Sequence, residues 1–225
     1  NGNMTLFKQK AEWVASEFKN YVPFKNISTL NMFYVPVETG SYCNFNCNGI
    51  ARLLCCNSAT ATTIASKCPN MAQIIVIHND PTYGGSGGTI STTSVNSAAP
   101  KVAVHEVGHS LFHLGDEYNY STTSSASSPN CDNAGCNKWK DMIGFNGTNC
   151  LSGKCAYSSY YASENTIMLA LSYLFEENNE RISCCTHHQF TGVFPAYCNK
   201  FLAYNLNTFC GITSPTSGAA PTQQK

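Results

Sequence analysis

The chain has 225 residues, of which 43% are hydrophobic and 12% aromatic, enough for one large domain or for two lobes with a real core. Thirteen basic and thirteen acidic side chains give a formal net charge of zero, and no basic block occurs, so we expect no surface for nucleic acid. No apolar run reaches the roughly 18 residues that a membrane span needs, and the chain shows no basic-then-apolar leader, so we expect any signal peptide to have been removed.

The first half of the chain alternates predicted helices and strands. Residues 5–20 predict a helix, because Phe7, Ala11, Val14 and Phe18 form one apolar stripe at helical spacing. Further elements follow in order: a strand at 30–38, a partly helical stretch at 48–67 interrupted near Asn57, a buried strand at 73–78, a polar or edge strand at 87–95, and a helix at 99–115. The last helix begins near Pro100 and stops at Gly115, as helices commonly do.

Many small residues gather in HNDPTYGGSGG, residues 78–88. The stretch contains no nucleotide-binding pattern and leads to a strand rather than a helix, which argues against a phosphate-binding loop. We interpret it as a connection at the border of a catalytic cleft. There the missing side chains of Gly84 and Gly85 would let a substrate backbone approach closely.

The predicted helix at 99–115 carries HEVGH, residues 105–109, which is an HExxH motif. Side chains at i and i+4 share one helix face, so His105 and His109 can bind one zinc ion through their imidazoles. Glu106 then lies beside the metal without ligating it, where it can take a proton from the zinc-bound water and pass it to the leaving amine. The alternative is a helix whose histidines only pack or cap.

A catalytic zinc ion takes three protein ligands and a water molecule, so a third ligand is needed. The candidates are His113, Asp116, Glu117, Glu164, His187 and His188. His113 lies about 12 Å of helical rise beyond His105, too far to share one ion on an unbroken helix. Gly115 can adopt a positive φ and end the helix, which would turn Asp116 back toward the metal. We therefore predict Asp116, with Glu117 as the near alternative and Glu164 or a downstream His as the distant one.

Thirteen cysteines are spread along the chain, and none forms a CxxC pair. This distribution favours the disulfide framework of a secreted protein over a structural zinc ribbon. Four glycosylation sequons, at Asn3, Asn26, Asn119 and Asn146, agree with secretion. Residues 120–160 have little periodicity and predict a long loop region held by disulfides, with local Cys131–Cys136 and Cys150–Cys155 pairs. Because thirteen is odd, at least one cysteine has no partner within the chain.

Three motifs, NDPTYGGSGG, HEVGHSLFHLGDEY and NTIM, resemble the catalytic domain of the bacterial IgA metallopeptidase family. These are secreted zinc endopeptidases related in layout to the metzincins, and the similarity extends over most of residues 20–190. The resemblance implies His105 and His109 as zinc ligands, Glu106 as the base, and an acidic third ligand, most simply Asp116. It also implies that Met168 supplies the methionine turn, which supports the site from beneath the metal.

The spacing after the second histidine departs from the usual metzincin pattern. Metzincins place a glycine three residues after that histidine and the third ligand six residues after it. Here those two positions are Phe112 and Gly115, and Asp116 lies one residue further on. The helix is therefore expected to run longer before it turns.

Together these features predict an α+β fold of the metzincin-like zinc peptidase type. Residues 1–116 would form an upper lobe, with a twisted mixed sheet, a backing helix and the zinc-binding helix. Residues 117–210 would form an irregular, disulfide-stapled lower lobe with the methionine turn and a last helix at 181–204. Residues 211–225, GITSPTSGAAPTQQK, are of low complexity and are expected to be a disordered tail.

We therefore predict a secreted, monomeric, zinc-dependent endopeptidase that acts on a protein or peptide substrate through Glu106-assisted attack of zinc-bound water. One alternative is a secreted adhesin or toxin module whose zinc is structural or which has lost turnover. The presence of Glu106 argues against it, because a structural site has no need of that carboxylate. A second alternative is a zinc peptidase with a downstream Glu, such as Glu164, as its third ligand.

Overall fold

The computed structural model describes residues 4–21, 24, 31–35, 42–68, 71–118, 127–144, 148–155, 159–163, 166–169 and 208–214. The chain divides into two compact units. Unit 1 consists of Asn1–Lys19, Ile27–Leu111 and Tyr204–Lys225, and unit 2 of Asn20–Asn26 and Phe112–Ala203.

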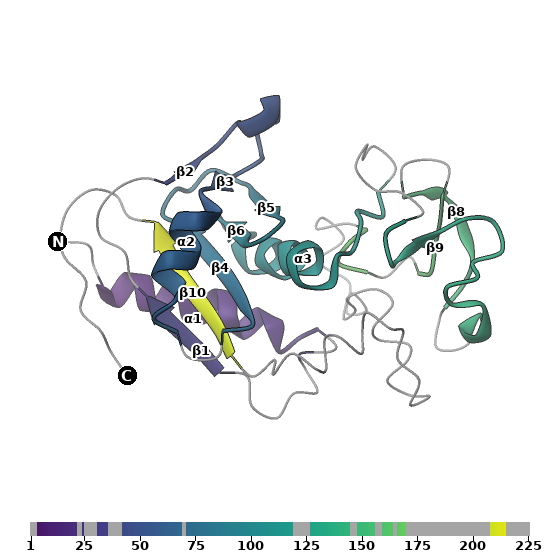
Figure 1. Cartoon of the computed structure of the whole chain (residues 1–225), viewed down its shortest axis with the longest axis horizontal. Coiled ribbons are helices and arrows are strands. Elements are labelled where there is room, and N and C mark those ends of the chain that lie inside the picture. The colour runs from purple at the N-terminus through teal and green to yellow at the C-terminus, as the bar shows by residue number, and fades with distance from the viewer. Residues whose placement is uncertain are drawn as a thin grey trace. The chain divides into compact units, whose positions relative to one another are not determined.

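The centre of unit 1 is a five-stranded sheet with the strand order β1-β10-β4-β6-β5 (Figure 1). Its strands are β1 (Asn31–Val35), β4 (Gln73–His78), β5 (Gly85–Gly87), β6 (Ser91–Thr93) and β10 (Thr208–Ser214). All neighbouring strands are parallel except β5, which pairs antiparallel with β6 at the edge. The expected mixed sheet is therefore present. Strand β10 lies between β1 and β4 and includes residues 211–214, which the sequence assigned to a tail.

Two of the inner strands, β4 and β6, differ in chemistry although both are buried. In β4, QIIVIH is buried from Gln73 to Ile77, as expected for a parallel strand that is covered on both faces. In β6, Ser91, Thr92 and Thr93 are polar but equally buried. Their hydroxyls are hydrogen-bonded within unit 1, for example from Thr92 Oγ1 to the Leu54 carbonyl at 2.7 Å. The predicted polar strand at 87–95 is thus an inner strand, and the edge strand lies in the glycine-rich stretch before it.

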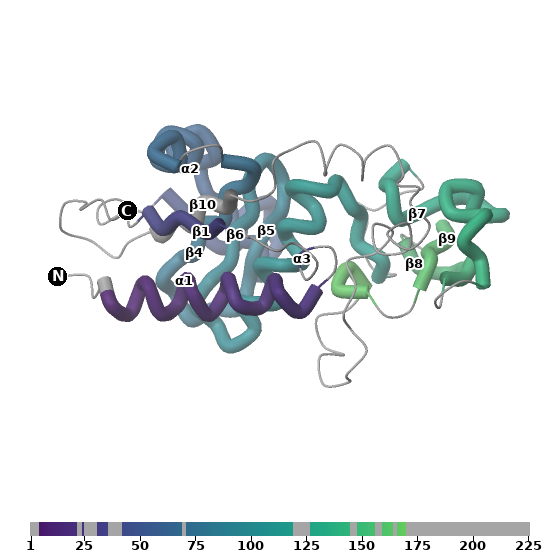
Figure 2. Tube along the Cα trace, turned by 90° about the horizontal axis from the view of Figure 1, so that it is seen from below, coloured from purple at the N-terminus to yellow at the C-terminus, as the bar shows by residue number. Residues whose placement is uncertain are grey.

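Helices cover both faces of this sheet. Helix α2 (Ser58–Ala65) lies on one face and α1 (Met4–Phe18) on the other, with the strands between them (Figure 2). The side chain of Asn57 accepts a hydrogen bond from Thr60 N–H at 2.9 Å and caps α2, which explains the interruption that the sequence predicted there. Helix α3 (Ala99–Phe112) carries HExxH and lies on the α1 side of the sheet, because its Ser110 is bonded to Gln73, whose neighbour Ile74 packs toward α2.

Two disulfides cross-link a small hairpin in unit 1. Strands β2 (Cys43–Asn44) and β3 (Cys55–Cys56) pair antiparallel, with a short 3-10 helix, η2 (Cys47–Gly49), between them. The bonds are Cys43–Cys56 and Cys47–Cys55. Cys68 is disulfide-bonded as well. The framework that the cysteine count predicted is therefore present.

Unit 2 contains a three-stranded antiparallel sheet of order β7-β9-β8, built from β7 (Cys131–Asp132), β8 (Leu151–Lys154) and β9 (Ser159–Tyr161). A 3-10 helix, η3 (Lys140–Met142), follows the buried Trp139. The disulfides here are Cys131–Cys155 and Cys136–Cys150, so the predicted local pairs were wrong. The sheet sets the pairing, because β7 and the end of β8 both flank β9. The predicted helix at 181–204 and the four sequons lie outside the described residues.

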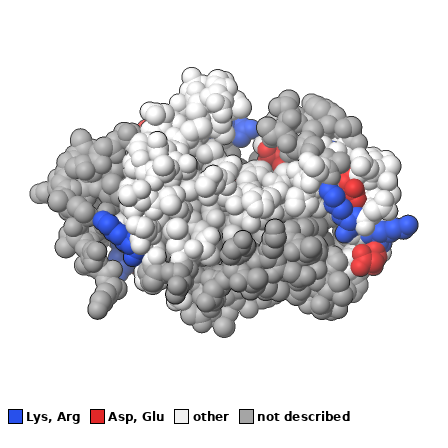
Figure 3. Space-filling view, in the orientation of Figure 1, with Lys and Arg blue, Asp and Glu red and all other residues white. Residues whose placement is uncertain are grey.

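Within the described residues, no helix is long and apolar enough to span a membrane. On the face shown in Figure 3, the described side chains are mostly uncharged, and the few charged ones at one end include both signs side by side.

Candidate metal centre

Helix α3 places His105 and His109 one turn apart, as the HExxH spacing predicts. His105 is buried and His109 is half-buried. Their rings are perpendicular, and the two Nε2 atoms are 3.1 Å apart. Two nitrogens that each lie about 2 Å from one tetrahedral zinc ion are about 3.3 Å from each other. Both imidazoles therefore point at one place and have the separation of a metal-binding pair.

Helix α3 ends at Phe112, and His113 adopts the left-handed conformation with φ of 57°. The prediction that Gly115 makes this turn was wrong. Phe112 and Leu114 are both buried while His113 is exposed, so packing of its two neighbours turns His113 outward. Histidine is one of the residues that tolerate positive φ better than most. As an exposed residue at the turn, His113 is not brought to the other two histidines.

Asp116 returns to the histidines directly after this turn. One ligand atom from each of His105, His109 and Asp116 lies within 4.8 Å of the other two. In the part of the chain that the structure describes, these three residues form the group of His, Cys and acidic side chains that could hold a metal ion. Two imidazole nitrogens and one carboxylate oxygen are a ligand set of catalytic zinc sites. Of the other candidates, Glu164, His187 and His188 lie outside the described residues.

Glu117, the near alternative, is fully buried and has another set of contacts. Its carboxylate accepts hydrogen bonds from Asn130 Nδ2 at 3.0 Å and from Thr166 Oγ1, so both oxygens are engaged. Its backbone N–H donates to the Met168 carbonyl at 3.0 Å. Glu117 thus links the segment after α3 to the turn that contains Met168.

Met168, for which a methionine turn was predicted, is fully buried. The Leu169 N–H donates to the Thr166 carbonyl at 3.2 Å and closes a turn. Because this turn is bonded to Glu117 through side chain and backbone, it is tied to the residue that follows Asp116.

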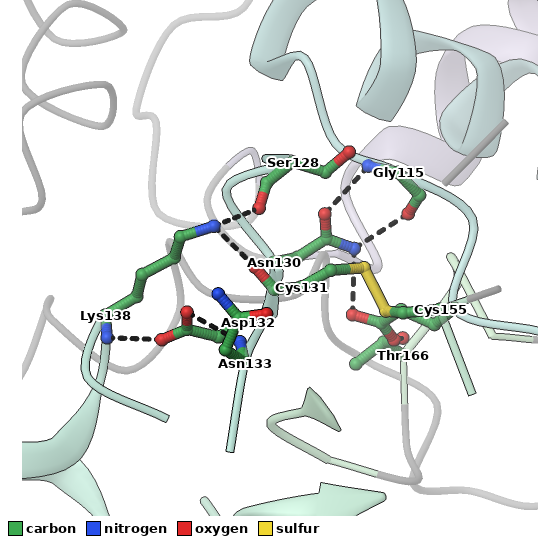
Figure 4. The surroundings of a disulfide bond; sticks show 10 residues. Gly115, Ser128, Asn130, Cys131, Asp132, Asn133, Lys138, Cys155 and Thr166 are labelled. Carbon is green, nitrogen blue, oxygen red and sulfur yellow. Dashed lines mark hydrogen bonds between the residues drawn. A yellow bond between two sulfur atoms is a disulfide. The ribbon is translucent and has the colours of Figure 1, made fainter. Parts of the chain in front are cut away.

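Asn130 holds the backbone on the other side of Asp116 (Figure 4). Its Oδ1 accepts from Gly115 N–H at 2.7 Å, and its Nδ2 donates to the Gly115 carbonyl at 2.7 Å. Asn130 is fully buried and precedes Cys131, which is bonded to Cys155. The amide therefore clamps both Gly115 and Glu117, the two neighbours of Asp116. Asn130 and Thr166 were not identified from the sequence. The one signal that could have pointed to these hydrogen-bond partners is the Glu117 carboxylate, which follows the predicted third ligand.

The connection after β4 is held by its own polar groups. Thr82 N–H donates to Asp80 Oδ1 at 2.7 Å, and hydrogen bonds from the Thr82 side chain and backbone lower the pKa of Asp80. Burial lowers the pKa of His78, whereas the nearby Asp80 opposes that shift. The His78 ring packs on Phe45 of the disulfide hairpin, with ring centroids 5.9 Å apart.

The glycines of this stretch do not leave room for a substrate. A Cβ atom on Gly84 would lie 2.2 Å from the Arg52 carbonyl oxygen and 2.8 Å from the Phe45 ring. On Gly85 it would lie 2.5 Å from Val102 of α3. The expectation of an open approach at Gly84 and Gly85 was therefore wrong, because the protein itself fills that space.

The comparison with known families agrees with this site. A sequence model of the family IgA Peptidase M64 matches residues 27–148, which is more than half of the chain and includes all of α3 and Asp116. A search of curated proteins finds no match.

Proposed function

Because the chain belongs to the IgA peptidase M64 family, which is a family of metallopeptidases, we propose that it is a secreted zinc-dependent endopeptidase. The observation that carries this proposal is the convergence of His105, His109 and Asp116, whose ligand atoms lie within 4.8 Å of one another. These residues would hold the ion, and their imidazole and carboxylate donors suit zinc. Zinc would supply a Lewis acid that polarises the scissile carbonyl and makes water more acidic.

Glu106 is the proposed general base. It follows His105 on α3, and its side chain is only 8% exposed. In this role its carboxylate takes a proton from the attacking water and delivers it to the nitrogen of the leaving amine. The shielded position keeps bulk water from competing for that proton.

The proposal extends to the surroundings of the site. We infer that the described disulfides reflect folding in an oxidising compartment, as expected of a secreted protein. We also propose a metzincin-like arrangement of two lobes, with the Met168 turn as the support of the metal site. A protein or peptide is the proposed substrate and a monomer the proposed state.

The decisive experiment compares the wild-type protein with Glu106→Ala in a casein or gelatin cleavage assay, with and without a chelator. We expect wild-type cleavage that the chelator abolishes, and in the variant a loss of at least about 100-fold in kcat with zinc still bound, because only the base is removed. Glu12→Ala is the matched control, since Glu12 is an exposed α1 residue whose ion pair with Lys8 spans 3.7 Å. Zinc content is measured for all three proteins.

A secreted zinc-binding adhesin or toxin module without turnover is the alternative from another class. It predicts bound zinc but no cleavage of any member of a broad peptide library by the wild type, and no difference between the wild type and Glu106→Ala. That pair of results would contradict the peptidase proposal.

The third ligand is tested by zinc titration of Asp116→Ala beside Glu164→Ala and Glu117→Gln. Asp116→Ala removes the carboxylate that lies with the two imidazoles, so we expect it to weaken zinc binding most. Glu117→Gln keeps the size of a buried side chain that has other partners. If Glu164→Ala lost zinc and Asp116→Ala kept it, the downstream Glu would be the third ligand.

A further inference from the structure

Strand β5 lies with its backbone directly against helix α3. The contacts alternate along the strand: Gly85 and Gly87 both approach the helix. On α3 they meet Val102, Glu106 and His109, which occupy one helix face at the spacing i, i+4 and i+7. Two of these three residues belong to the HExxH motif.

Gly87 makes the closest approach to the motif. A Cβ atom there would lie 2.5 Å from the Glu106 carbonyl oxygen, 2.5 Å from His109 Cβ and 3.2 Å from Glu106 Oε2. A separation of 2.5 Å is far shorter than a van der Waals contact. The two atoms at this distance are a backbone oxygen of Glu106 and the Cβ of His109, which move only with the helix backbone. A methyl group at residue 87 therefore requires the helix or the strand to move.

Backbone conformation does not explain these glycines. Neither Gly85 nor Gly87 has a positive φ, and neither has the following Gly88. At Gly88 a Cβ would meet nothing within 4 Å. Glycine is thus needed at 85 and 87 for close approach to α3, and Gly88 offers a position in the same stretch where that need is absent.

Strand β5 cannot easily move away from the helix. Between the two glycines, Ser86 points the other way, and its Oγ donates to the Leu54 carbonyl at 2.6 Å. The same hydroxyl lies 3.1 Å from Thr92 Oγ1 on β6. The antiparallel pairing of β5 with β6 fixes the strand further.

Helix α3 is also fixed in place, by hydrogen bonds of Ser110, the residue after His109. Ser110 Oγ accepts from Gln73 Nε2 at 2.7 Å and lies 2.6 Å from Ser91 Oγ. All three side chains are buried, so a shift of the helix would leave polar groups without partners, at a cost of roughly 1–3 kcal/mol for each group. Displacement caused at residue 87 therefore reaches Glu106 and His109.

We propose that Gly87 is a positioning residue of the metal site: its missing side chain lets β5 set the placement of the Glu106 carboxylate and the His109 imidazole. This inference rests on the proposed function of Glu106 as base and His109 as ligand. Gly85 shares the packing role but contacts the motif less, since its Cβ would meet Val102 Cγ1 at 2.5 Å, the Thr92 carbonyl at 2.6 Å and Glu106 Cγ at 3.1 Å.

The test compares Gly87→Ala, Gly85→Ala and Gly88→Ala with the wild type. Thermal unfolding measures packing, the absorption spectrum of the cobalt-substituted protein reports ligand geometry, zinc titration gives the dissociation constant, and peptide cleavage gives kcat. Gly85→Ala and Gly87→Ala should both lower Tm. Gly87→Ala should also change the cobalt spectrum and lower kcat about 100-fold at full metal occupancy, since misplacement by about 1 Å costs that much. Gly88→Ala should match the wild type throughout.

The inference is overturned if Gly87→Ala lowers only Tm, with its cobalt spectrum and kcat like those of the wild type. It is also overturned if Gly85→Ala and Gly87→Ala lose kcat equally. If Gly87→Ala does not fold, Gly85→Ala decides: a lower Tm with a wild-type cobalt spectrum and kcat supports the inference, because packing against Val102 is then separate from placement of the motif. A changed spectrum with kcat reduced about 100-fold at full zinc occupancy refutes it. A wild type that binds metal but cleaves nothing refutes the proposed function instead, while the cobalt spectra still test the placement of His109.

Discussion

His113 and Asn130 together direct the chain after helix α3. His113 turns the backbone at the end of α3, and Asn130 holds Gly115 and Glu117 on either side of Asp116. Asp116 lies three residues after the residue with positive φ. The usual metzincin pattern has the same step between its glycine and its third ligand. Both positions lie one residue further from the second histidine here than in that pattern.

Asn130→Ala should weaken both the fold and the metal site. It removes the partners of the Gly115 backbone and of one Glu117 oxygen, which are buried, so we expect a loss of about 3 kcal/mol in the free energy of unfolding. Because Asp116 lies between the two released residues, zinc affinity should fall at least about 10-fold, as for other groups that orient metal ligands. Denaturant unfolding and zinc titration measure the two effects.

Asn133→Ala is the control for this prediction, because Asn133 is exposed on the same segment. Unchanged zinc affinity in Asn130→Ala, despite a lower stability, would show that Asn130 supports only the fold.

At the level of single residues, His105, Glu106 and His109 lie on a helix where the sequence predicted one. His105, Glu106 and His109 are related by a local helical spacing, which a sequence shows directly. The turn was assigned to Gly115, because glycine is the commonest residue with positive φ. In the structure His113 has the positive φ instead, because its neighbours Phe112 and Leu114 are both buried. Asn130 could not be predicted, since no local pattern connects it with Gly115.

Among the elements, the two disulfides that the structure describes in unit 2 have different neighbours. Cys131–Cys155 packs with Tyr161 and with Leu169, the residue after Met168. Cys136–Cys150 belongs to a separate cluster with Trp139 and Met142. Only the first bond therefore borders both Asn130 and the turn that is tied to Glu117.

Removing each of these two disulfides in turn should show which one supports metal binding as well as stability. The double variants Cys131→Ala/Cys155→Ala and Cys136→Ala/Cys150→Ala each release a loop, with sequence separations of 24 and 14. Each should cost about 3 kcal/mol in stability. Only the first should also lower zinc affinity, by about 10-fold, because it loosens the support of Asp116. Equal zinc affinities in the two variants, measured by titration under native conditions, would contradict this assignment.

Elements with a strong local signal in the sequence were predicted correctly, whereas features that depend on strand pairing were not. Helix α1, strand β4 and helix α3 have the expected periodicity, apolar run or end signals. The stretch that contains β6 was predicted to be a polar or edge strand. It is polar but lies inside the sheet, where hydrogen bonds to Leu54, Ala99 and Ser110 allow it to be buried. The disulfide pairs depend on strand pairing, which spacing along the chain does not reveal.

For the whole molecule, the sheet of unit 1 depends on β10, which among the described strands lies furthest along the chain. β10 lies between β1 and β4 and pairs with both in parallel. The sequence did not predict it, because TFCGITS is short, contains a glycine and precedes a low-complexity stretch. The two strands beside it were recognised, but their separation by a third could not be read from local periodicity.

A chain that ends after residue 203 should fail to form the sheet of unit 1. Without β10, β1 and β4 lose their shared neighbour along five and six positions. We expect loss of the cooperative unfolding transition and of zinc binding, measured by circular dichroism and zinc titration. A chain that ends after residue 214 is the matched control and should retain both. Native-like melting of the shorter chain would show that β10 is dispensable.

The place of β10 also orders events during synthesis of the protein. The ribosome completes helix α3 and the whole sequence of unit 2 before residues 208–214 emerge. Until then, β1 and β4 have no common partner, and α3 lies on an unfinished sheet. A nascent chain of this protein is therefore held back from its final form until the last strand inserts. Because the proposed metal site lies on a helix of unit 1, we expect peptidase activity to appear only after β10 has inserted.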